Sequence, residues 1–97
     1  MKTRLAKSYE ILNIMNFIKE NSVKIPGLSA NDSVHEYMAT IMEHIMRNEA
    51  KLALFNDKIV GFAVLDKNSS DSFFAVDNTL ASSDYDGALN LLMSATV

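Results

Sequence analysis

The stretch KLALFNDKIVGFAVL, which runs from Lys51 to Leu65, decides the fold of this chain. It contains two apolar runs separated by residues 56–58, Asn-Asp-Lys, which are polar residues of the kind that reverse a chain. Branched and aromatic side chains on both sides suit a pleated sheet, so the stretch predicts a β-hairpin rather than an ordinary loop. The second run, residues 59–65, is apolar at every position except Gly61. A strand of this composition is buried on both faces, and we therefore expect helices on both sides of its sheet.

The composition is that of one globular domain spanning residues 1–97. Hydrophobic residues make up 48% of the chain and charged residues 22%, which is ordinary for a soluble protein. No apolar run approaches the roughly 18 residues that cross a bilayer. The basic residues Lys2, Arg4 and Lys7 are followed by an amphipathic pattern, which is unlike a signal peptide. Because the chain has no cysteine, disulfides, thiolate metal sites and thiol catalysis are excluded. We expect a cytoplasmic protein with no membrane partner.

Charge is distributed unevenly along the chain. The net charge is −3, which argues against nucleic acid as a partner. All nine Lys and Arg residues lie at or before Lys67, whereas the last third carries Asp71, Asp77, Asp84 and Asp86. Such a segment would repel an anionic ligand and favour a basic partner, although a solvated acidic face explains the same pattern.

The remaining secondary structure follows from capping residues and periodicity. Ser8 can cap a helix whose first turn contains Glu10, which suits the helix dipole, and Ser33 and Glu36 have the spacing of a capping box. We expect an edge strand over residues 2–6, then a helix capped by Ser8 that ends near Asn21 or Ser22 and a helix from Ser33 that ends before Asn48. After the hairpin we expect a third strand of the central sheet over residues 72–76 and a short helix over residues 85–93.

Both N-terminal helices carry apolar residues at helical spacing, and we expect these residues to face the core. The first helix has Ile11, Leu12, Ile14, Met15, Phe17 and Ile18, and the second has Val34, Tyr37, Met38, Ile41, Met42, Ile45 and Met46. Methionine stripes also occur at adaptable binding surfaces, but a role in the core is the commoner one.

The two histidines do not predict a metal site. His35 and His44 lie nine residues apart on one predicted helix, which places them on opposite faces. We expect both side chains to be exposed and unable to share a metal ion. Glu36, Glu43 and Glu49 indicate a solvated helix face.

The predicted order of elements, β-α-α-β-β-β-α, resembles the N-terminal two-thirds of the GNAT family of N-acetyltransferases. Residues 3–15, TRLAKSYEILNIM, resemble the family's first strand and capped helix, and residues 51–63, KLALFNDKIVGFA, resemble its second and third strands. DYDGA, Asp84 to Ala88, falls where the family has its phosphate-binding turn. The resemblance implies an α+β fold with a mixed sheet and helices on both faces, and a family activity that depends on acetyl-CoA.

The phosphate-binding turn departs from the family pattern, which is Gln/Arg-x-x-Gly-x-Gly/Ala at a helix N-terminus. Only Gly87 fits one of its positions, and Asp84 and Asp86 flank the place of the phosphates. Each carboxylate would cost on the order of 1 kcal/mol or more at an effective dielectric constant near 20. We therefore expect the cofactor site to be lost. If acyl-CoA does bind, the resemblance assigns its contacts to Gly87 and Ala88.

No pattern in the chain forms a self-sufficient active site. A general base on the third or fourth strand would have to be Asp77, but an aspartate at the end of a strand is more often a turn former. Tyr85 comes too early in the chain for the general acid of the family. No serine stands in a nucleophile-elbow pattern.

The strand over residues 72–76 pairs with a fifth strand in the family, and this chain has no counterpart of that strand. Phe73, Phe74, Ala75 and Val76 would then form an apolar edge that invites pairing with another chain. The edge could be covered in a homodimer, by a target protein that adds a strand, or by the C-terminal segment. We favour the homodimer, and we count Asp84 and Asp86 with the edge as candidate partner-binding residues.

Two functions of different class follow. The first, which we prefer, is a non-catalytic GNAT-like binding module that acts through homodimerisation or capture of a protein partner. A trimmed enzyme fold of this kind would suit a phage or mobile-element protein that inhibits a host factor. The alternative is a minimal acetyl-CoA-dependent N-acyltransferase whose cleft is completed across a dimer.

Overall fold

Four strands of the described chain form one sheet in the order β1-β2-β3-β4, with every neighbouring pair antiparallel. The computed structural model describes residues 1–29, 31–65 and 72–94. In chain order the elements are β1 (Lys2–Leu5), a 3₁₀ turn η1 (Ser8–Glu10), α1 (Ile11–Glu20), α2 (Val34–Met46), β2 (Ala50–Phe55), β3 (Lys58–Val64), β4 (Phe73–Val76) and α3 (Ser82–Met93). The fold is α+β, and the predicted succession of strands and helices is confirmed.

The central hairpin forms as predicted. β2 ends at Phe55 and β3 begins at Lys58, so Asn56 and Asp57 alone make the turn. Both have positive φ angles, 50° and 64°, which is the backbone of a type I′ turn, and Asn and Asp tolerate this conformation better than other non-glycine residues. The register of the hairpin shifts between Ala53 and Leu54, where β3 carries an extra residue.

The expectation of a mixed sheet is wrong for the described strands. β2 and β3 are joined by a two-residue turn, and only residues 65–72 separate β3 from β4. A parallel pair needs a crossover of about a dozen residues or more, so connections this short produce antiparallel neighbours.

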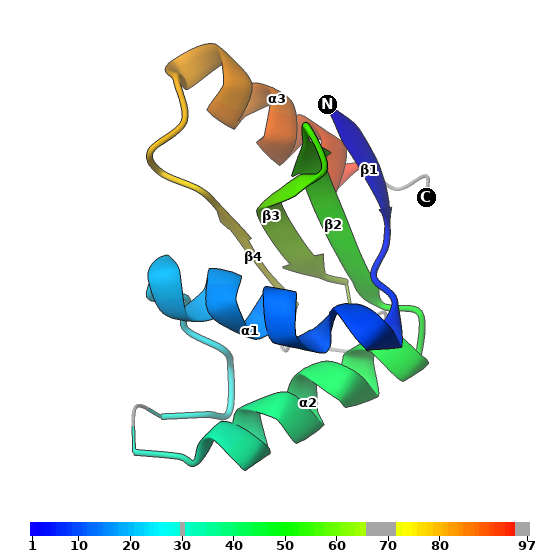
Figure 1. Ribbon diagram of the computed structural model, residues 1–97, viewed down its shortest axis with the longest axis vertical. Helices are drawn as coiled ribbons and strands as arrows, with labels where there is room; N and C mark the ends of the chain where they lie inside the picture. Colours follow the sequence, from blue (N-terminus) through cyan, green and yellow to red (C-terminus); the bar gives the residue numbers. More distant parts are fainter. Residues whose placement is uncertain (30, 66–71, 95–97) are drawn as a thin grey trace.

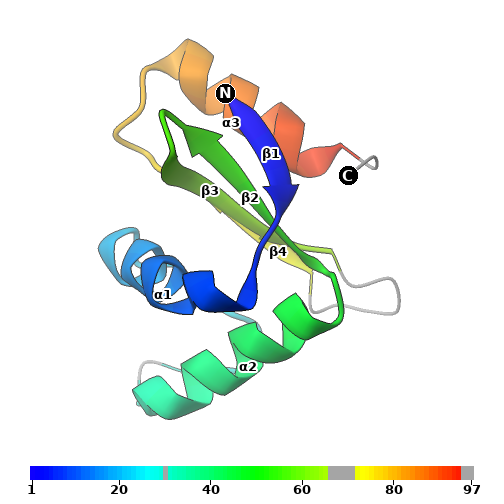
Figure 2. The ribbon, with the colours of Figure 1, turned by 45° about the vertical axis from the view of Figure 1, so that its right-hand side comes forward.

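Helices cover both faces of the sheet, as predicted (Figures 1 and 2). α1 and α2 lie on one face and α3 lies on the other. The core under α1 and α2 includes Ile14, Phe17, Ile18, Ile41, Ile45, Leu52, Phe62 and Val64. The core under α3 consists of Ala53, Val60, Ala63, Val76, Ala88 and Leu92. Side chains of β3 alternate between these two cores, which accounts for its nearly continuous apolar sequence.

Gly61 allows α3 to lie close to the centre of the sheet. A Cβ atom at this position would stand 2.7 Å from Leu92 Cδ1 and 3.2 Å from Ala53 Cβ. Leu92 is fully buried, so it has little room to move away. The glycine of the hairpin is therefore explained by packing, because a side chain there would push α3 from the sheet.

The cap of α2 is the one that the sequence predicts. Ser33 precedes the helix with an extended backbone, and its Oγ accepts a hydrogen bond of 3.2 Å from the Glu36 N–H. This bond satisfies one of the N–H groups that have no partner in the first turn. α2 ends at Met46, so Asn48 and Glu49 lie beyond it, as expected.

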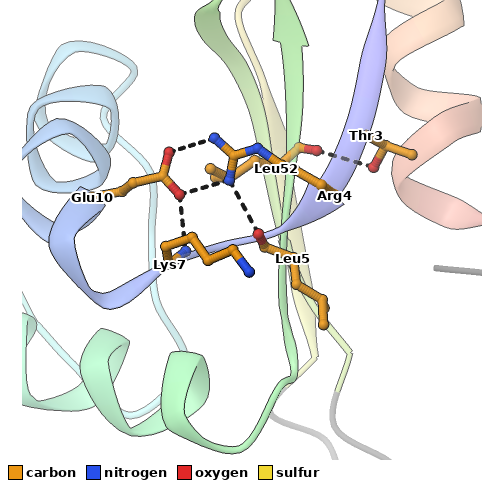
Figure 3. A network of polar contacts seen from close by, with 6 residues as sticks. All are labelled: Thr3, Arg4, Leu5, Lys7, Glu10 and Leu52. Atoms are coloured by element: carbon orange, nitrogen blue, oxygen red, sulfur yellow. Dashed lines mark hydrogen bonds and ion pairs between the residues drawn. The ribbon is translucent and has the colours of Figure 1, made fainter.

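A network around Glu10 ties β1 to the start of α1 (Figure 3). Nη1 and Nη2 of Arg4 each donate to one carboxylate oxygen of Glu10 at 2.7 Å, and the Lys7 N–H donates to Oε1 at 2.9 Å. Glu10 is buried, and the hydrogen bonds from Arg4 hold the pKa of its carboxyl below the ordinary value. The sequence suggested only a helix-dipole role for this residue, whereas the structure shows a bidentate ion pair with the edge strand.

Candidate functional site

β4 forms an edge of the sheet, and on its outer side no strand lies among the residues that the structure describes. Its inner side pairs with β3, with Phe73 opposite Val64 and Val76 opposite Gly61. Phe74 is 49% exposed, an unusual fraction for a phenylalanine in a sheet. The predicted strand and its position at the edge are thus confirmed within the described chain.

The backbone of β4 divides into groups that point inward and groups that point outward. The Asp77 N–H donates to the Val60 carbonyl at 2.8 Å, and this bond continues the β3–β4 ladder. Because pairing groups alternate along an antiparallel strand, Phe73 and Ala75 bond toward β3. The N–H and C=O groups of Phe74 and Val76 therefore point away from β3, toward the outer edge.

The side chains of β4 also alternate. Phe73 and Ala75 pack against the core under α1 and α2, and the Phe73 ring lies 5.8 Å from the Phe62 ring at 60°. Val76 is buried in the core under α3, and Phe74 points to the same face by alternation. The edge residue that offers an apolar side chain to solvent is thus Phe74.

Gly87 and Ala88 lie in the helix that the sequence predicts over residues 85–93, and this helix, α3, begins three residues earlier, at Ser82. The phosphate-binding turn that the GNAT resemblance places at Asp84 to Ala88 is therefore part of a helix in this chain. Their N–H groups belong to the helix, and Ala88 is fully buried against the sheet. A helical glycine costs about 1 kcal/mol, and burial of Ala88 and Leu92 offsets this cost. Neither residue presents a backbone N–H to a ligand.

The turn that leads from β4 into α3 spans residues 77–81. The Asp77 carboxylate accepts hydrogen bonds from the Thr79 hydroxyl at 2.7 Å and the Thr79 N–H at 2.9 Å. These bonds hold the pKa of Asp77 below its ordinary value, so it is an anion at neutral pH and a poor general base. An anionic ligand at this helix terminus would meet Asp77 and also Asp84, which lies in the first turn of α3. Asp77 is thus the turn former that its position at the end of a strand suggests.

The acidic residues proposed to bind a partner belong to α3 and not to the β4 edge. Asp84 is half-buried and Asp86 is exposed. Residues two positions apart on a helix do not face each other, so the two carboxylates do not form a paired acidic site.

His44 contradicts the expectation of an exposed histidine. It lies three residues after Ile41 on the core face of α2 and is only 8% exposed. Its Nδ1 atom lies 3.7 Å from Oε1 of Glu49, which is itself largely buried, so Glu49 does not belong to a solvated face. Within residues 1–29, 31–65 and 72–94, neither atom has a hydrogen-bond partner. His35 is exposed, as expected.

Lys51 is a buried cation that sequence reasoning missed. It is 1% exposed, and its Nζ donates to the carbonyl oxygens of Ser94 at 2.7 Å and Leu91 at 3.3 Å. A positive charge suits the C-terminal end of a helix, where carbonyl groups lack helical partners. The signal was a lysine within the apolar run of β2, and its burial gives it a structural role.

The described residues offer no obvious metal centre or membrane span. In residues 1–29, 31–65 and 72–94, no three His, Cys, Asp or Glu side chains gather as metal ligands would. No helix in the same ranges combines the length and apolar character that a bilayer requires.

Comparisons with protein-family models, with curated proteins and with solved structures find no match. The resemblance to the GNAT family, which depends on motifs and element order, therefore stays a prediction. The conclusions about function below depend on the geometry of this chain.

Proposed function

We propose that the chain is a non-catalytic binding module with a GNAT-like fold, and that it acts by pairing β4 with the β4 strand of a second copy. The observation that carries this proposal is the outer edge of β4, where the backbone groups of Phe74 and Val76 point outward and Phe74 is half-exposed. The GNAT-like part is supported by the order of strands and helices alone.

The two edges of the sheet differ in a way that favours β4 as the one that pairs. β1 carries Lys2 and Arg4, and charges of this kind discourage strand pairing. β4 has the sequence Phe-Phe-Ala-Val, with no charge and no proline. An edge of this composition is a template for another strand unless something covers it.

A second copy is a suitable partner because β4 is complementary to itself. In an antiparallel pairing around a two-fold axis at Ala75, Phe74 of one copy lies opposite Val76 of the other. These are the residues whose N–H and C=O groups point outward, so each donor meets an acceptor. The pairing joins apolar residues over the length of β4 and brings no like charges together between Phe73 and Val76.

A minimal acetyl-CoA-dependent N-acyltransferase is the competing function, and no contact among the described residues favours it. The N–H groups of Gly87 and Ala88 are used within α3, and Asp77 holds the turn before that helix as an anion. Calorimetry with acetyl-CoA tests this point. Binding at micromolar concentration would overturn the non-catalytic proposal, whereas silence at millimolar ligand would support it.

Analytical ultracentrifugation of the purified protein tests the dimer directly. We expect a dimer whose population falls on dilution, and a monomer for Phe74→Lys, because the two-fold axis would bring the two lysines near each other at a charged edge. Since Phe74 is half-exposed, this variant should keep its circular dichroism spectrum. Met46→Lys is the matched control: Met46 is 71% exposed on α2, so this variant should stay dimeric. A monomeric wild-type protein at high concentration, or a dimeric Phe74→Lys, would contradict the proposal.

A further inference from the structure

An apolar groove runs between α1 and the N-terminal half of α2. Leu12 is 66% exposed and Val34 is 65% exposed, although the sequence predicts both on stripes that face the core. They line a groove of about 460 Å³ together with Met15, Tyr37 and Met38. The two exposed apolar side chains, Leu12 and Val34, thus belong to the same groove.

A second hollow continues this groove. It has a volume of about 400 Å³ and shares Ser22, Val23 and Tyr37 with the first, and it adds Lys24 and Leu28. We call the two together the α1–α2 groove. Exposed apolar patches that are this contiguous commonly mark interaction sites.

The walls of the α1–α2 groove are fixed by hydrogen bonds within the chain. The Tyr37 hydroxyl donates to the Ser29 carbonyl at 2.8 Å and so holds the connecting segment against α2. The Ser29 N–H donates to Asp32 Oδ2 at 2.7 Å. A groove held in this way needs little rearrangement to accept a ligand, which lowers the entropic cost of binding.

The charge of the groove is opposite to that of the whole chain. Among the described residues that line it, the charged side chains are Lys19 and Lys24. The carboxylate of Asp32, which accepts from the Ser29 N–H, lies beside this lining and is not part of it. The chain as a whole has a net charge of −3. A partner that combines an apolar surface with acidic groups therefore fits the groove.

The shape favours an elongated partner. Leu12 and Val34 remain largely exposed, so the groove is open to solvent there, and the two adjoining hollows together make it longer than a single pocket. An open apolar groove between two helices suits an amphipathic helix with anchors at positions i, i+3 or i+4, and i+7. Met15 and Met38 have flexible, polarizable side chains that adapt to such anchors.

We propose that the α1–α2 groove binds an amphipathic helix of a partner protein, with apolar anchors on one face and acidic residues on either side of that face. Leu12, Val34 and Met38 contact the anchors, and Lys19 and Lys24 pair with the acidic residues. This surface is separate from the β4 edge, so the proposal does not depend on dimerisation.

Fluorescence anisotropy with a labelled helical peptide tests this inference. The probe carries leucines at i, i+3, i+7 and i+10 and glutamates beside them, and its control has lysine in place of each glutamate. We expect the acidic peptide to bind at least about tenfold more tightly than the basic one. The double variant Lys19→Glu/Lys24→Glu should reverse this preference, because exposed charge pairs change affinity by about two- to fivefold each.

Single substitutions locate the binding surface. Leu12→Glu should weaken the acidic peptide about tenfold or more, because it places a carboxylate where an anchor lies. Met46→Glu, on the exposed far end of α2, should leave the affinity unchanged. Phe74→Lys should also leave it unchanged, so failure of the dimer and failure of this inference are distinguishable.

Several results would overturn the inference. Equal binding of both peptides, no binding of either, or normal binding by Leu12→Glu would each do so. Binding to phosphatidylserine vesicles that Leu12→Glu abolishes, without peptide binding, would identify a membrane surface instead. A change in oligomeric state of Leu12→Glu would show that a second copy occupies the groove.

Discussion

Replacing Glu10 by glutamine removes a buried charge while keeping the size of the side chain. In the wild-type protein this carboxylate accepts two hydrogen bonds of 2.7 Å from Arg4 and one of 2.9 Å from the Lys7 N–H. The amide of glutamine has one acceptor oxygen, and its NH₂ group would face a guanidinium donor. Glu10→Gln therefore weakens all three bonds and leaves one donor of Arg4 without an acceptor.

The magnitude follows from these three bonds. Hydrogen bonds to charged groups contribute about 1.5–3 kcal/mol each, compared with about 0.5–1.5 kcal/mol for neutral ones. If each of the three bonds changes from a charged to a neutral one, the folded protein loses about 3 kcal/mol of stability. The Arg4 side chain is 40% exposed, however, so solvent screening reduces this loss. We expect the free energy of unfolding to fall by about 2 kcal/mol, which lowers the melting temperature by roughly 8–15 °C in a domain of this size.

The effect has a defined dependence on pH. Arg4 lowers the pKa of Glu10 in the folded protein relative to its ordinary value of about 4.3. The stabilisation is therefore fully present above about pH 5 and is lost as the pH falls through the lowered value. The difference between wild type and Glu10→Gln should be constant from pH 7 to pH 5 and should shrink toward pH 3.

Urea denaturation, monitored by circular dichroism at pH 7 and pH 3, measures the loss in the free energy of unfolding and its dependence on pH. Glu43→Gln is the matched control, because Glu43 pairs with Arg47 one turn along α2 and both side chains are more than half exposed. Its cost should be about 0.5 kcal/mol or less. If Glu10→Gln costs no more than Glu43→Gln, or if its cost is the same at both pH values, the reasoning is wrong.

Three further substitutions test local features by thermal denaturation. Ser33→Ala removes the cap of α2 and should destabilise the protein by about 1 kcal/mol. An unchanged stability would show that the hydrogen bond from the Glu36 N–H to the Ser33 hydroxyl does not stabilise the helix. Gly87→Ala should stabilise it by about 0.5–1 kcal/mol, because a Cβ there meets nothing within 4 Å in a helix interior, and a loss of stability would contradict the placement of α3. Gly61→Ala should instead destabilise it by about 1–2 kcal/mol through overlap with Leu92, and a neutral result would show that the sheet and α3 separate easily.

The fold was largely readable from the sequence because its strongest signals are local. The Asn56–Asp57 turn and the Ser33 cap each depend on residues that are adjacent or three apart, and both formed as predicted. The prediction of a mixed sheet was wrong because it came from a family resemblance. The short connections between the strands of this chain indicate antiparallel pairs instead. The edge position of β4 came from the same resemblance, and it agrees with the strand order among the described residues.

The candidate site was harder to predict. Its structure depends on whether the conformational preference of single residues or the packing of their neighbours against the sheet dominates. The GNAT resemblance placed a turn at Gly87, whereas the helix predicted over residues 85–93 forms, and burial of Ala88 against the sheet outweighs the preference of one glycine. His44 and Lys51 were misjudged for another reason. His44 follows Ile41 by three residues and Lys51 stands in an apolar run, so periodicity indicates burial of both, whereas the residue types indicate exposure.

The bond between Lys51 and the end of α3 has a consequence for the order in which the chain assembles. Before residues 82–94 pack on the sheet, the ammonium group of Lys51 lacks the carbonyl oxygens of Leu91 and Ser94, and the apolar residues beside it lack Ala88 and Leu92. One face of the sheet is covered by α1 and α2, which lie within the first two-thirds of the chain. The opposite face is covered by α3, which comes later in the chain. Docking of α3 is thus a late, long-range event, and amide protons of that helix should exchange before those of the central hairpin.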